Sequence, residues 1–389
     1  MNLCFFDDKK RNNFFPLVYF RPIPKLMVGA FTIEDKWKKV VKNVDSISYA
    51  TEDYLYKLKF VQPELSENYL FINSRIIPTR QQIEQIIEER SLLYTDDRSI
   101  ASFYGTLDEF KSLFHKSQNG PGLINTFQYI WDLIFANESL LQEDAEFFHS
   151  FNPLSNSANV YLKHPEKIFI SPDAEIEPGV VLDATEGPII VDDEAVIMAN
   201  SVIKGPVYIG KKSLIKALSK CYGHLSIGPV CKIGGEVAES IILGYSNKQH
   251  DGFLGHAYLG EWCNLGADTN NSDLKNNYSE ITVYLNGKAT QTGHRFLGLI
   301  MGDHSKTAIN TSFNTGTIVG INANIFARGF VKKFVPSFSW HGDNLMRKYD
   351  LQKAKEVAQI VMGRRNIQFT EAVSEVFDYL YEFTQTIEG

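Results

Sequence analysis

The chain has 389 residues, of which 44% are apolar and 22% charged, and its formal net charge is −7 at pH 7. This length predicts two or three domains, the composition is ordinary for a soluble globular protein, and the negative charge argues against a general nucleic-acid binder. The four cysteines form no C-x-x-C pair, and no leader pattern is visible. No apolar stretch approaches the ~20 residues of a membrane-spanning helix. We therefore expect a cytoplasmic protein with no membrane partner.

Residues 1–155 have the mixed pattern of an α/β domain. Short apolar runs at 3–6 and 69–73 predict buried strands. Two segments have the character of helices: 78–92, with Pro78 near its start, and 121–150. A segment rich in Ser, Asn and Pro at 150–159 predicts the boundary with the next domain.

Beyond this boundary an apolar residue returns every six positions, and seven of the eight residues in the longest run are β-branched. The run is Val191, Ile197, Ile203, Ile209, Ile215, Cys221, Ile227 and Ile233. A period of six is typical of a chain that makes a short strand, turns and repeats, with three units closing a triangular coil of about 18 residues. The hexapeptide pattern therefore predicts an all-β left-handed parallel β-helix over 160–342, with the aliphatic side chains inside.

The repeat breaks at 183–190 and again at 238–300. Insertions in a solenoid loop out of the coil, often on a functional face, so the longer break is the expected place for chemistry. Residues 343–389 are rich in helix formers at helical spacing and predict a short C-terminal helical cap, with Gly363 separating two helices.

The β-helix together with residues 244–278 (GYSNKQHDGFLGHAYLGEWCNLGADTNNSDLKNNY) resembles the bacterial GlmU-like family, in an alternate branch with an altered N-terminal domain. Enzymes of that family acetylate glucosamine-1-phosphate and then couple the product to a uridine nucleotide. The resemblance implies a nucleotidyltransferase-like, Rossmann-like domain before the β-helix, acetyl-CoA as co-substrate, an amino sugar or sugar phosphate as acceptor, and a homotrimer. For the altered N-terminal domain three alternatives stay open: an active nucleotidyltransferase, a retained fold that binds a nucleotide sugar, or a domain that only stabilises the assembly.

The resemblance assigns roles to individual residues of this loop. His250 matches the family's general base, and a histidine has the unperturbed pKa suited to take a proton from an amine. Asn264 matches an acceptor-sugar asparagine, and Ala327 falls near an alanine of the acetyl-CoA site. Phe253 replaces a tyrosine, which removes one hydroxyl contact.

The segment 237–245 contains no lysine where the family has a phosphate-binding one, so Lys248 or Lys275 is the expected substitute. Asn270 and Asn271 are either ligand-binding residues or part of a solvated turn. His256 is expected to be structural, and the transfer itself to need no metal ion.

The N-terminal segment 5–29 resembles the family's phosphate-binding loop but has no glycine before Arg11, although glycine normally allows the close backbone approach that phosphate needs. Four cations are the expected phosphate ligands: Arg11, Arg21, Lys25 and Arg75. Residues 73–75 (Asn, Ser, Arg) stand where the family has a metal-holding aspartate, so magnesium is expected only if an active pyrophosphorylase survives.

Three other functions fit the same sequence. In the first, the chain is a sugar-1-phosphate nucleotidyltransferase, of the UDP-N-acetylglucosamine pyrophosphorylase or thymidylyltransferase type, that uses the β-helix for assembly. In the second, the chain is a non-catalytic scaffold that binds a nucleotide sugar. The least favoured is a zinc hydratase that uses histidines in or beyond the broken region: His250, His256, His294 and His304.

Overall fold

The computed structural model describes residues 1–114, 122–151, 159–342 and 345–388. They form two compact units. The N-terminal unit comprises Met1–Phe14, Val18–Leu26 and Phe31–Asp132, and the solenoid unit comprises Phe15–Leu17, Met27–Ala30 and Leu133–Gly389. The expected linker at 150–159 falls largely on 152–158, outside the described residues, and the proposed bounds 1–155, 160–342 and 343–389 stay a prediction.

The N-terminal unit is built on a mixed six-stranded sheet in the order β4-β1-β5-β7-β6-β8. Its strands are β1 (Asn2–Phe6), β4 (Ser46–Ala50), β5 (Asn68–Asn73), β6 (Leu93–Thr95), β7 (Ile100–Thr106) and β8 (Gly122–Ile124). Strand β1 runs parallel to both neighbours, whereas β7 is antiparallel to β5 and β6. Because β1 is buried between two parallel partners, it reads as a continuous apolar run, as the sequence predicted.

Three helices of this unit are α1 (Ile33–Val40), α2 (Arg80–Glu89) and α3 (Leu107–Phe114). Thr79 begins α2, because its hydroxyl accepts the N–H of Gln82 at 3.3 Å, and the apolar Ile83 and Ile86 lie on the buried face. The helix expected over 78–92 is therefore confirmed with slightly shorter bounds. Two short strands, β2 (Met27–Val28) and β3 (Phe31–Thr32), precede α1.

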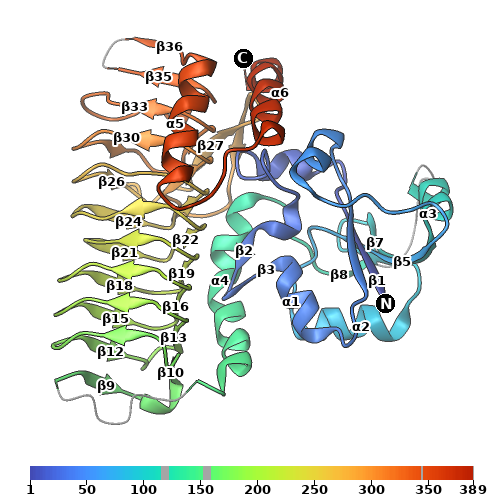
Figure 1. The fold of residues 1–389 in the computed structure, drawn as a ribbon, viewed down its shortest axis with the longest axis horizontal. Helices are drawn as coiled ribbons and strands as arrows, with labels where there is room; N and C mark the ends of the chain where they lie inside the picture. The colour runs from blue at the N-terminus through green and yellow to red at the C-terminus, as the bar shows by residue number, and fades with distance from the viewer. Residues whose placement is uncertain (115–121, 152–158, 343–344, 389) are drawn as a thin grey trace. The chain divides into compact units, whose positions relative to one another are not determined.

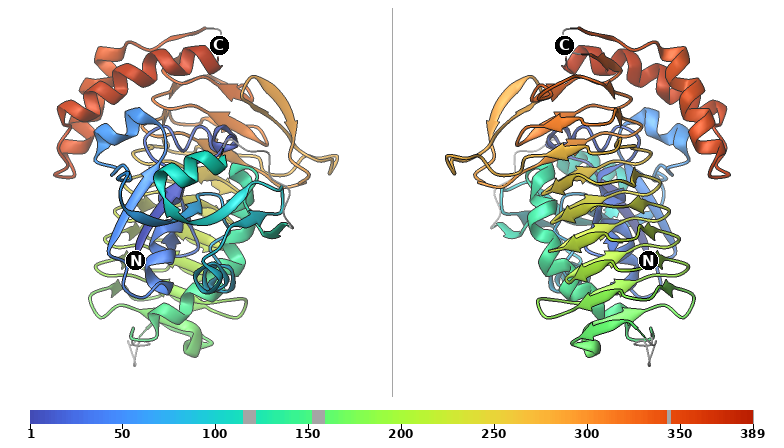
Figure 2. Two further views of the ribbon diagram at one scale, coloured as in Figure 1. Left: turned by 90° about the vertical axis from the view of Figure 1, so that its right-hand side faces the viewer. Right: turned by 90° about the vertical axis from the view of Figure 1, so that its left-hand side faces the viewer.

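The solenoid unit is a three-sided stack of parallel coils, visible from the side in Figure 1 and from two further directions in Figure 2. One face has nine strands: β10 (Ile168–Ile170), β13 (Ile189–Val191), β16 (Val207–Ile209), β19 (Leu225–Ile227), β22 (Ile241–Ile242), β25 (Tyr258–Leu259), β29 (Leu299–Met301), β32 (Thr317–Val319) and β34 (Phe334–Val335).

The second face contains two groups of strands. They are β11 (Glu175–Ile176), β14 (Val196–Ile197), β17 (Leu214–Ile215), β20 (Lys232–Ile233) and β23 (Asn247–Lys248), then β30 (Lys306–Thr307), β33 (Asn324–Ile325), β35 (Ser339–His341) and β36 (Met346–Lys348). The third face holds β9 (Tyr161–Lys163), β12 (Val181–Asp183), β15 (Val202–Lys204), β18 (Lys220–Tyr222), β21 (Glu236–Ala238) and β24 (Phe253–Gly255), then β26 (Asn270–Asn271) and β31 (Ser312–Phe313).

All eight residues of the predicted six-residue series are fully buried and belong to one continuous apolar core inside the coils. The fold class expected from the sequence, an α/β domain followed by a parallel β-helix with a helical end, is thereby confirmed. In the part of the chain that the structure describes, no helix has the length and apolar character required to span a membrane.

The long break in the repeat is narrower than the sequence pattern indicates. Coils continue through β21 to β26, and only residues 272–298 leave the stack. This segment, called the insertion below, carries the antiparallel hairpin of β27 (Thr282–Leu285) and β28 (Lys288–Gln291). The pattern was lost earlier because polar residues take interior positions: Lys248 pairs with Ile233, and Asn271 pairs with Phe313. A search for apolar periodicity cannot register such coils.

Helices complete the solenoid unit. From Leu133 onward, α4 (Ile130–Asp144) lies along the nine-stranded face, where Asn137 accepts the hydroxyl of Ser226 at 3.0 Å, and the strands β13, β16 and β19 are buried throughout. The two expected C-terminal helices are α5 (Leu351–Gly363) and α6 (Glu371–Glu388). Their contacts run down the side of the last coils, with Phe377 of α6 edge-on to His304.

Candidate functional site

The residue expected to act as base, His250, lies in the turn between β23 and β24 and is exposed. The turn is anchored from inside the coil, because Lys248 Nζ donates to the His250 carbonyl at 2.8 Å and to the Gly234 carbonyl at 2.9 Å. The side chain of His250 is therefore presented to solvent from a fixed main chain.

Lys248 itself does not reach the surface. The residue is 1% exposed, and its ammonium group lies in the apolar interior, where burial lowers the pKa to about 8. Its observed partners are the two backbone carbonyls, so in this structure it supports the turn that carries His250. Contact between Lys248 and an acceptor stays a prediction.

The two asparagines expected to bind ligand are bonded to the preceding coil. Asn270 Oδ1 accepts the N–H of Phe253 at 2.7 Å. Asn271 brackets Gly255, accepting its N–H at 2.9 Å and donating to its carbonyl at 3.0 Å. Because both amides satisfy main-chain groups, they join β24 to the next coil.

The remaining predicted acceptor residues are dispersed over several coils. Asn264 continues the ladder between β23 and β30 through bridges to Asn247 and Lys306. Lys275 lies in the insertion, where its ammonium group donates to the Glu280 carbonyl. Ala327 is 8% exposed, in the coil that follows β33. The structure places His250 in the turn between Lys248 of β23 and Phe253 of β24, and the roles of all the predicted acceptor-site residues stay predictions.

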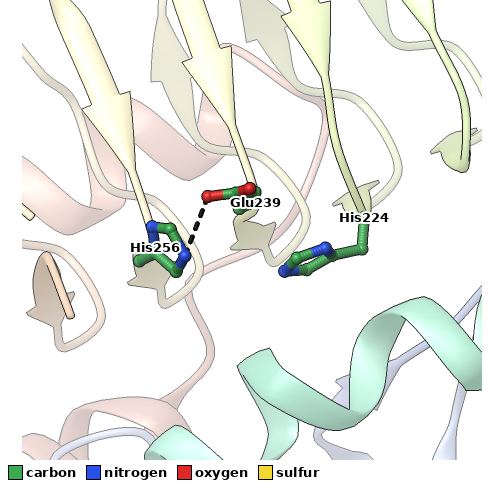
Figure 3. A group of neighbouring side chains, drawn as sticks. All are labelled: His224, Glu239 and His256. Carbon is green, nitrogen blue, oxygen red and sulfur yellow. Dashed lines mark ion pairs between the residues drawn. The ribbon is translucent and has the colours of Figure 1, made fainter. Parts of the chain in front are cut away.

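A second group of polar side chains gathers at one corner of the solenoid. We define the corner cluster as His224, Glu239, His256 and Asp273. Three of them follow β18, β21 and β24, whose ends are in register because Tyr222 pairs with Ala238, and Ala238 with Gly255. Residues just past the three strand ends are therefore stacked in line, as Figure 3 shows for His224, Glu239 and His256.

His256 lies at the centre of the corner cluster. Its Nε2 is 2.8 Å from Glu239 Oε2, and its Nδ1 is 2.9 Å from Asp273 Oδ2. Gly255 permits the close approach of Asp273, since a Cβ at that position would lie only 2.7 Å from Asp273 Oδ2. The ring centroid of His256 is 6.2 Å from the ring centroid of His224.

Aromatic side chains surround the corner cluster. Phe296 of the insertion stacks on His256 with ring centroids 5.0 Å apart, and Phe135 of α4 lies 6.2 Å from it. Asn137 of the same helix donates to the His224 carbonyl at 2.6 Å. These contacts cover His256, whose side chain is 9% exposed, whereas the Glu239 side chain stays 35% exposed. The bond from Asn137 holds the main chain of His224.

The pKa values of the two histidines in the corner cluster shift in opposite directions. Burial lowers the pKa of His224. Burial acts in the same sense on His256, but the hydrogen bonds to Asp273 and Glu239 outweigh it and raise the pKa of His256 to about 9. At neutral pH the structure therefore holds a neutral His224 beside an imidazolium flanked by two carboxylates.

The sequence pointed only partly to this cluster. His256 was expected to be structural, while His224 and Glu239 were not singled out, because they lie 32 and 17 residues before it in the chain. An alignment of the coils could have found these residues, because each of the three lies within two positions of the end of a strand of the third face.

The N-terminal unit has a cavity of about 310 Å³ at the carboxyl ends of β1 and β5. Its lining includes three cationic residues, one aspartate and one asparagine: Lys9, Lys10, Arg98, Asp8 and Asn73. Ligands of α/β sheets bind beyond the carboxyl ends of parallel strands, so this is the expected place for a phosphate group. Lys9 and Arg98 were not among the sequence predictions.

Several cations that were predicted to bind phosphate form ion pairs within the unit. The Arg11 guanidinium is 3.0 Å from Asp7, and Lys25 is 2.9 Å from Glu34. Arg21 is 6% exposed. Phosphate binding by these residues stays a prediction.

Arg75 belongs to the segment 73–75, where the resemblance implies a metal-holding carboxylate. Its Nη2 lies 2.6 Å from Asp8 Oδ2 and 3.1 Å from Asp97 Oδ2. Because a buried guanidinium already neutralises both carboxylates, these residues do not fit a magnesium ion.

Comparison with known proteins gives a family match for one part of the chain. Residues 3–151 match the family model described as sugar nucleotidyl transferase. A bifunctional sugar-1-phosphate nucleotidylyltransferase/acetyltransferase of Sulfurisphaera tokodaii is 34% identical over 152 residues, which are 39% of this chain and 38% of that protein. The bifunctional protein GlmU of Methanocaldococcus jannaschii is 27% identical over 314 residues, 79% of this chain and 69% of the relative.

Among solved structures, the polySia-specific acetyltransferase NeuO is similar to 49% of this chain and 86% of its own, at 14% identity and a TM-score of 0.26. The resemblance to the GlmU-like family is confirmed by the sequence relatives. The chain spans 38% of the length of the Sulfurisphaera protein and 27% of that of a GlmU protein from Methanococcus maripaludis, which is 31% identical over 113 residues.

Proposed function

We propose that the protein is a transferase of sugar-nucleotide biosynthesis whose solenoid transfers an acetyl group from acetyl-CoA to the amine of an amino sugar phosphate, with His250 as general base. The observation that carries the proposal is the geometry of the β23–β24 turn, where an exposed imidazole stands on a main chain anchored by Lys248. The likeness to bifunctional nucleotidylyltransferase/acetyltransferases supports the class of reaction.

The proposed step is direct transfer. The acceptor amine attacks the thioester carbonyl, His250 takes the proton that the amine loses, and the tetrahedral intermediate collapses with release of the CoA thiolate, which is then protonated. An exposed histidine at a fixed turn suits this role because both substrates must reach it from solvent. The homotrimer expected from the resemblance is part of the proposal, and the mass of the assembly in solution tests it.

The test is CoA release from acetyl-CoA in the presence of a panel of amino sugar 1-phosphates, followed with a thiol reagent. We expect His250→Ala to lower kcat by about 10²- to 10⁴-fold, the usual contribution of a general base. His164→Ala, at an exposed histidine before the first full coil, is the matched control and keeps its activity. Activity retained in folded His250→Ala, or no CoA release with any acceptor, contradicts the proposal.

A second function, nucleotidyl transfer to a sugar 1-phosphate, is favoured by the family match over residues 3–151 and by the cationic cavity in the same unit. The replacement of the expected metal-holding carboxylate by Arg75 argues against the family's usual magnesium chemistry. Pyrophosphate release from a nucleoside triphosphate and a sugar 1-phosphate distinguishes an active enzyme from a unit that only binds nucleotide.

A further inference from the structure

We propose that the corner cluster of the solenoid binds a divalent transition-metal ion, with His224, Glu239 and His256 as ligands and Asp273 orienting His256. One ligand atom from each of the three residues lies within 4.8 Å of the others. Two imidazoles and one carboxylate are a donor set suited to zinc, which typically takes four ligands and so would leave one position for water or an anionic group. This site is separate from the turn that carries His250.

The first observation in favour of a metal is a buried imidazole nitrogen in the cluster whose hydrogen-bonding capacity is unsatisfied. Among the residues that the structure describes, His224 Nε2 is buried and has no hydrogen-bond partner. A buried polar atom without a partner destabilises the fold, so native proteins nearly always satisfy such atoms. Coordination of a metal by the neutral imidazole would satisfy His224.

The second observation is the arrangement around His256. Asp273 takes the Nδ1 side of the ring at 2.9 Å and leaves Nε2 facing Glu239 at 2.8 Å. A carboxylate bonded to the far nitrogen of a histidine is the usual support of a metal-bound imidazole, because it fixes both the tautomer and the ring orientation. A metal ion would replace the proton that His256 and Glu239 now share.

The third observation is that the three ligands follow paired strands and that the central ligand, His256, is buried. The strands before the three ligands are paired in register, and Asn137 fixes the carbonyl of His224 at 2.6 Å. Phe135 and Phe296 supply an apolar surrounding for His256. Ligands held on paired strands under aromatic cover need little rearrangement on binding, which favours affinity.

The competing explanation is an ion pair alone, in which protonated His256 bridges Glu239 and Asp273 without any metal. The two explanations differ at His224. An ion pair of His256 does not require the His224 side chain, whereas a metal site loses a ligand without it. His224→Ala is therefore the decisive variant, and Glu239→Gln is a second one that retains the size of the side chain.

The experiment titrates the metal-free full-length protein with Co²⁺ and follows visible absorption, with Zn²⁺ added as competitor. We expect one Co²⁺ per chain, with the intense bands of a low-coordinate site, and displacement by Zn²⁺. His224→Ala and Glu239→Gln lose the bands. His294→Ala, whose ring stacks on Phe135 at 3.7 Å but lies outside the ligand set, retains them as the matched control.

Thermal unfolding supplies a readout that does not depend on absorption or on acetyl transfer. Because a ligand that binds only the folded state stabilises it, Zn²⁺ should raise the Tm of the wild type and of His294→Ala but not of His224→Ala. Wild-type protein that takes up neither metal at one equivalent overturns the proposal. So does a folded His224→Ala variant that binds Co²⁺ as the wild type does.

Discussion

Polar residues at interior positions of the solenoid hide the apolar repeat, and they limit how much of the candidate site the sequence could predict. Lys248 was predicted as the substitute for a phosphate-binding lysine that the resemblance implies, and Asn271 as part of either a ligand-binding loop or a solvated turn. In the structure both occupy interior positions of continuing coils. Sequence spacing identifies the turn that carries His250. It does not reveal which side of the coil each neighbour faces once the apolar marker is replaced by a polar residue.

The buried ammonium of Lys248 predicts an unusual dependence of stability on pH. Its pKa is about 8 in the folded protein and about 10.4 in an unfolded chain. The folded state therefore disfavours the charged form, and the destabilisation, roughly 3 kcal/mol from ~1.36 kcal/mol per pKa unit, is fully present below pH 8. It disappears as pH rises through 10.4.

The expected result is that the stability difference between Lys248→Met and the wild type depends on pH. Relative to Lys248→Met, the wild type should gain free energy of unfolding between about pH 8 and 10.4, measured by urea denaturation at each pH. Taking the difference cancels other groups that titrate in this range. Equal pH dependence of the two proteins would show that Lys248 is not buried as a charge.

At the scale of elements, the six-residue period predicted the coils wherever aliphatic residues fill the interior, as from β13 to β20. It could not predict that α4 lies along the nine-stranded face, because the contact between Asn137 of α4 and Ser226 of β19 joins residues 89 positions apart in the chain. Nor could it reveal the corner cluster, whose members lie next to one another only after the strands are in register.

Strand β26 provides the prediction at this scale. Asn271 satisfies both main-chain groups of Gly255, and its removal would leave two buried polar groups without a partner. At about 1–3 kcal/mol for each of the two unsatisfied groups, we expect Asn271→Ala to lower the free energy of unfolding by roughly 2–6 kcal/mol.

Chemical denaturation measures this loss, with Asn276→Ala at an exposed position of the insertion as the control that should change it by under about 0.5 kcal/mol. A stable Asn271→Ala variant with a raised KM for the acceptor would instead favour the ligand-binding role predicted from the sequence.

At the scale of the whole molecule, two compact units carry two separate sets of candidate residues. The sequence predicted both fold types, because buried strands and the six-residue period are local properties of the chain. It could not predict that Arg75 pairs with Asp8 and Asp97 near the expected nucleotide site, since these residues are separated by more than 20 positions and meet only through the order of the sheet.

This division predicts that the two proposed functions, nucleotide binding and acetyl transfer, can be removed independently. Lys9→Ala combined with Arg98→Ala takes two cationic side chains from the lining of the N-terminal cavity. We expect this double variant to bind nucleoside triphosphates at least about tenfold more weakly by calorimetry, because charge-assisted bonds to phosphate contribute about 1.5–3 kcal/mol each. Its rate of CoA release should equal that of the wild type.

His250→Ala should show the reverse pattern, with normal nucleotide affinity and little CoA release. Lys111→Ala, at an exposed position of α3 outside the cavity lining, serves as the control for lost charge in the N-terminal unit. If the double variant binds nucleotide normally, the cavity is not the nucleotide site. If it also abolishes acetyl transfer while remaining folded, the two functions are coupled, and the assignment of one function to each unit is wrong.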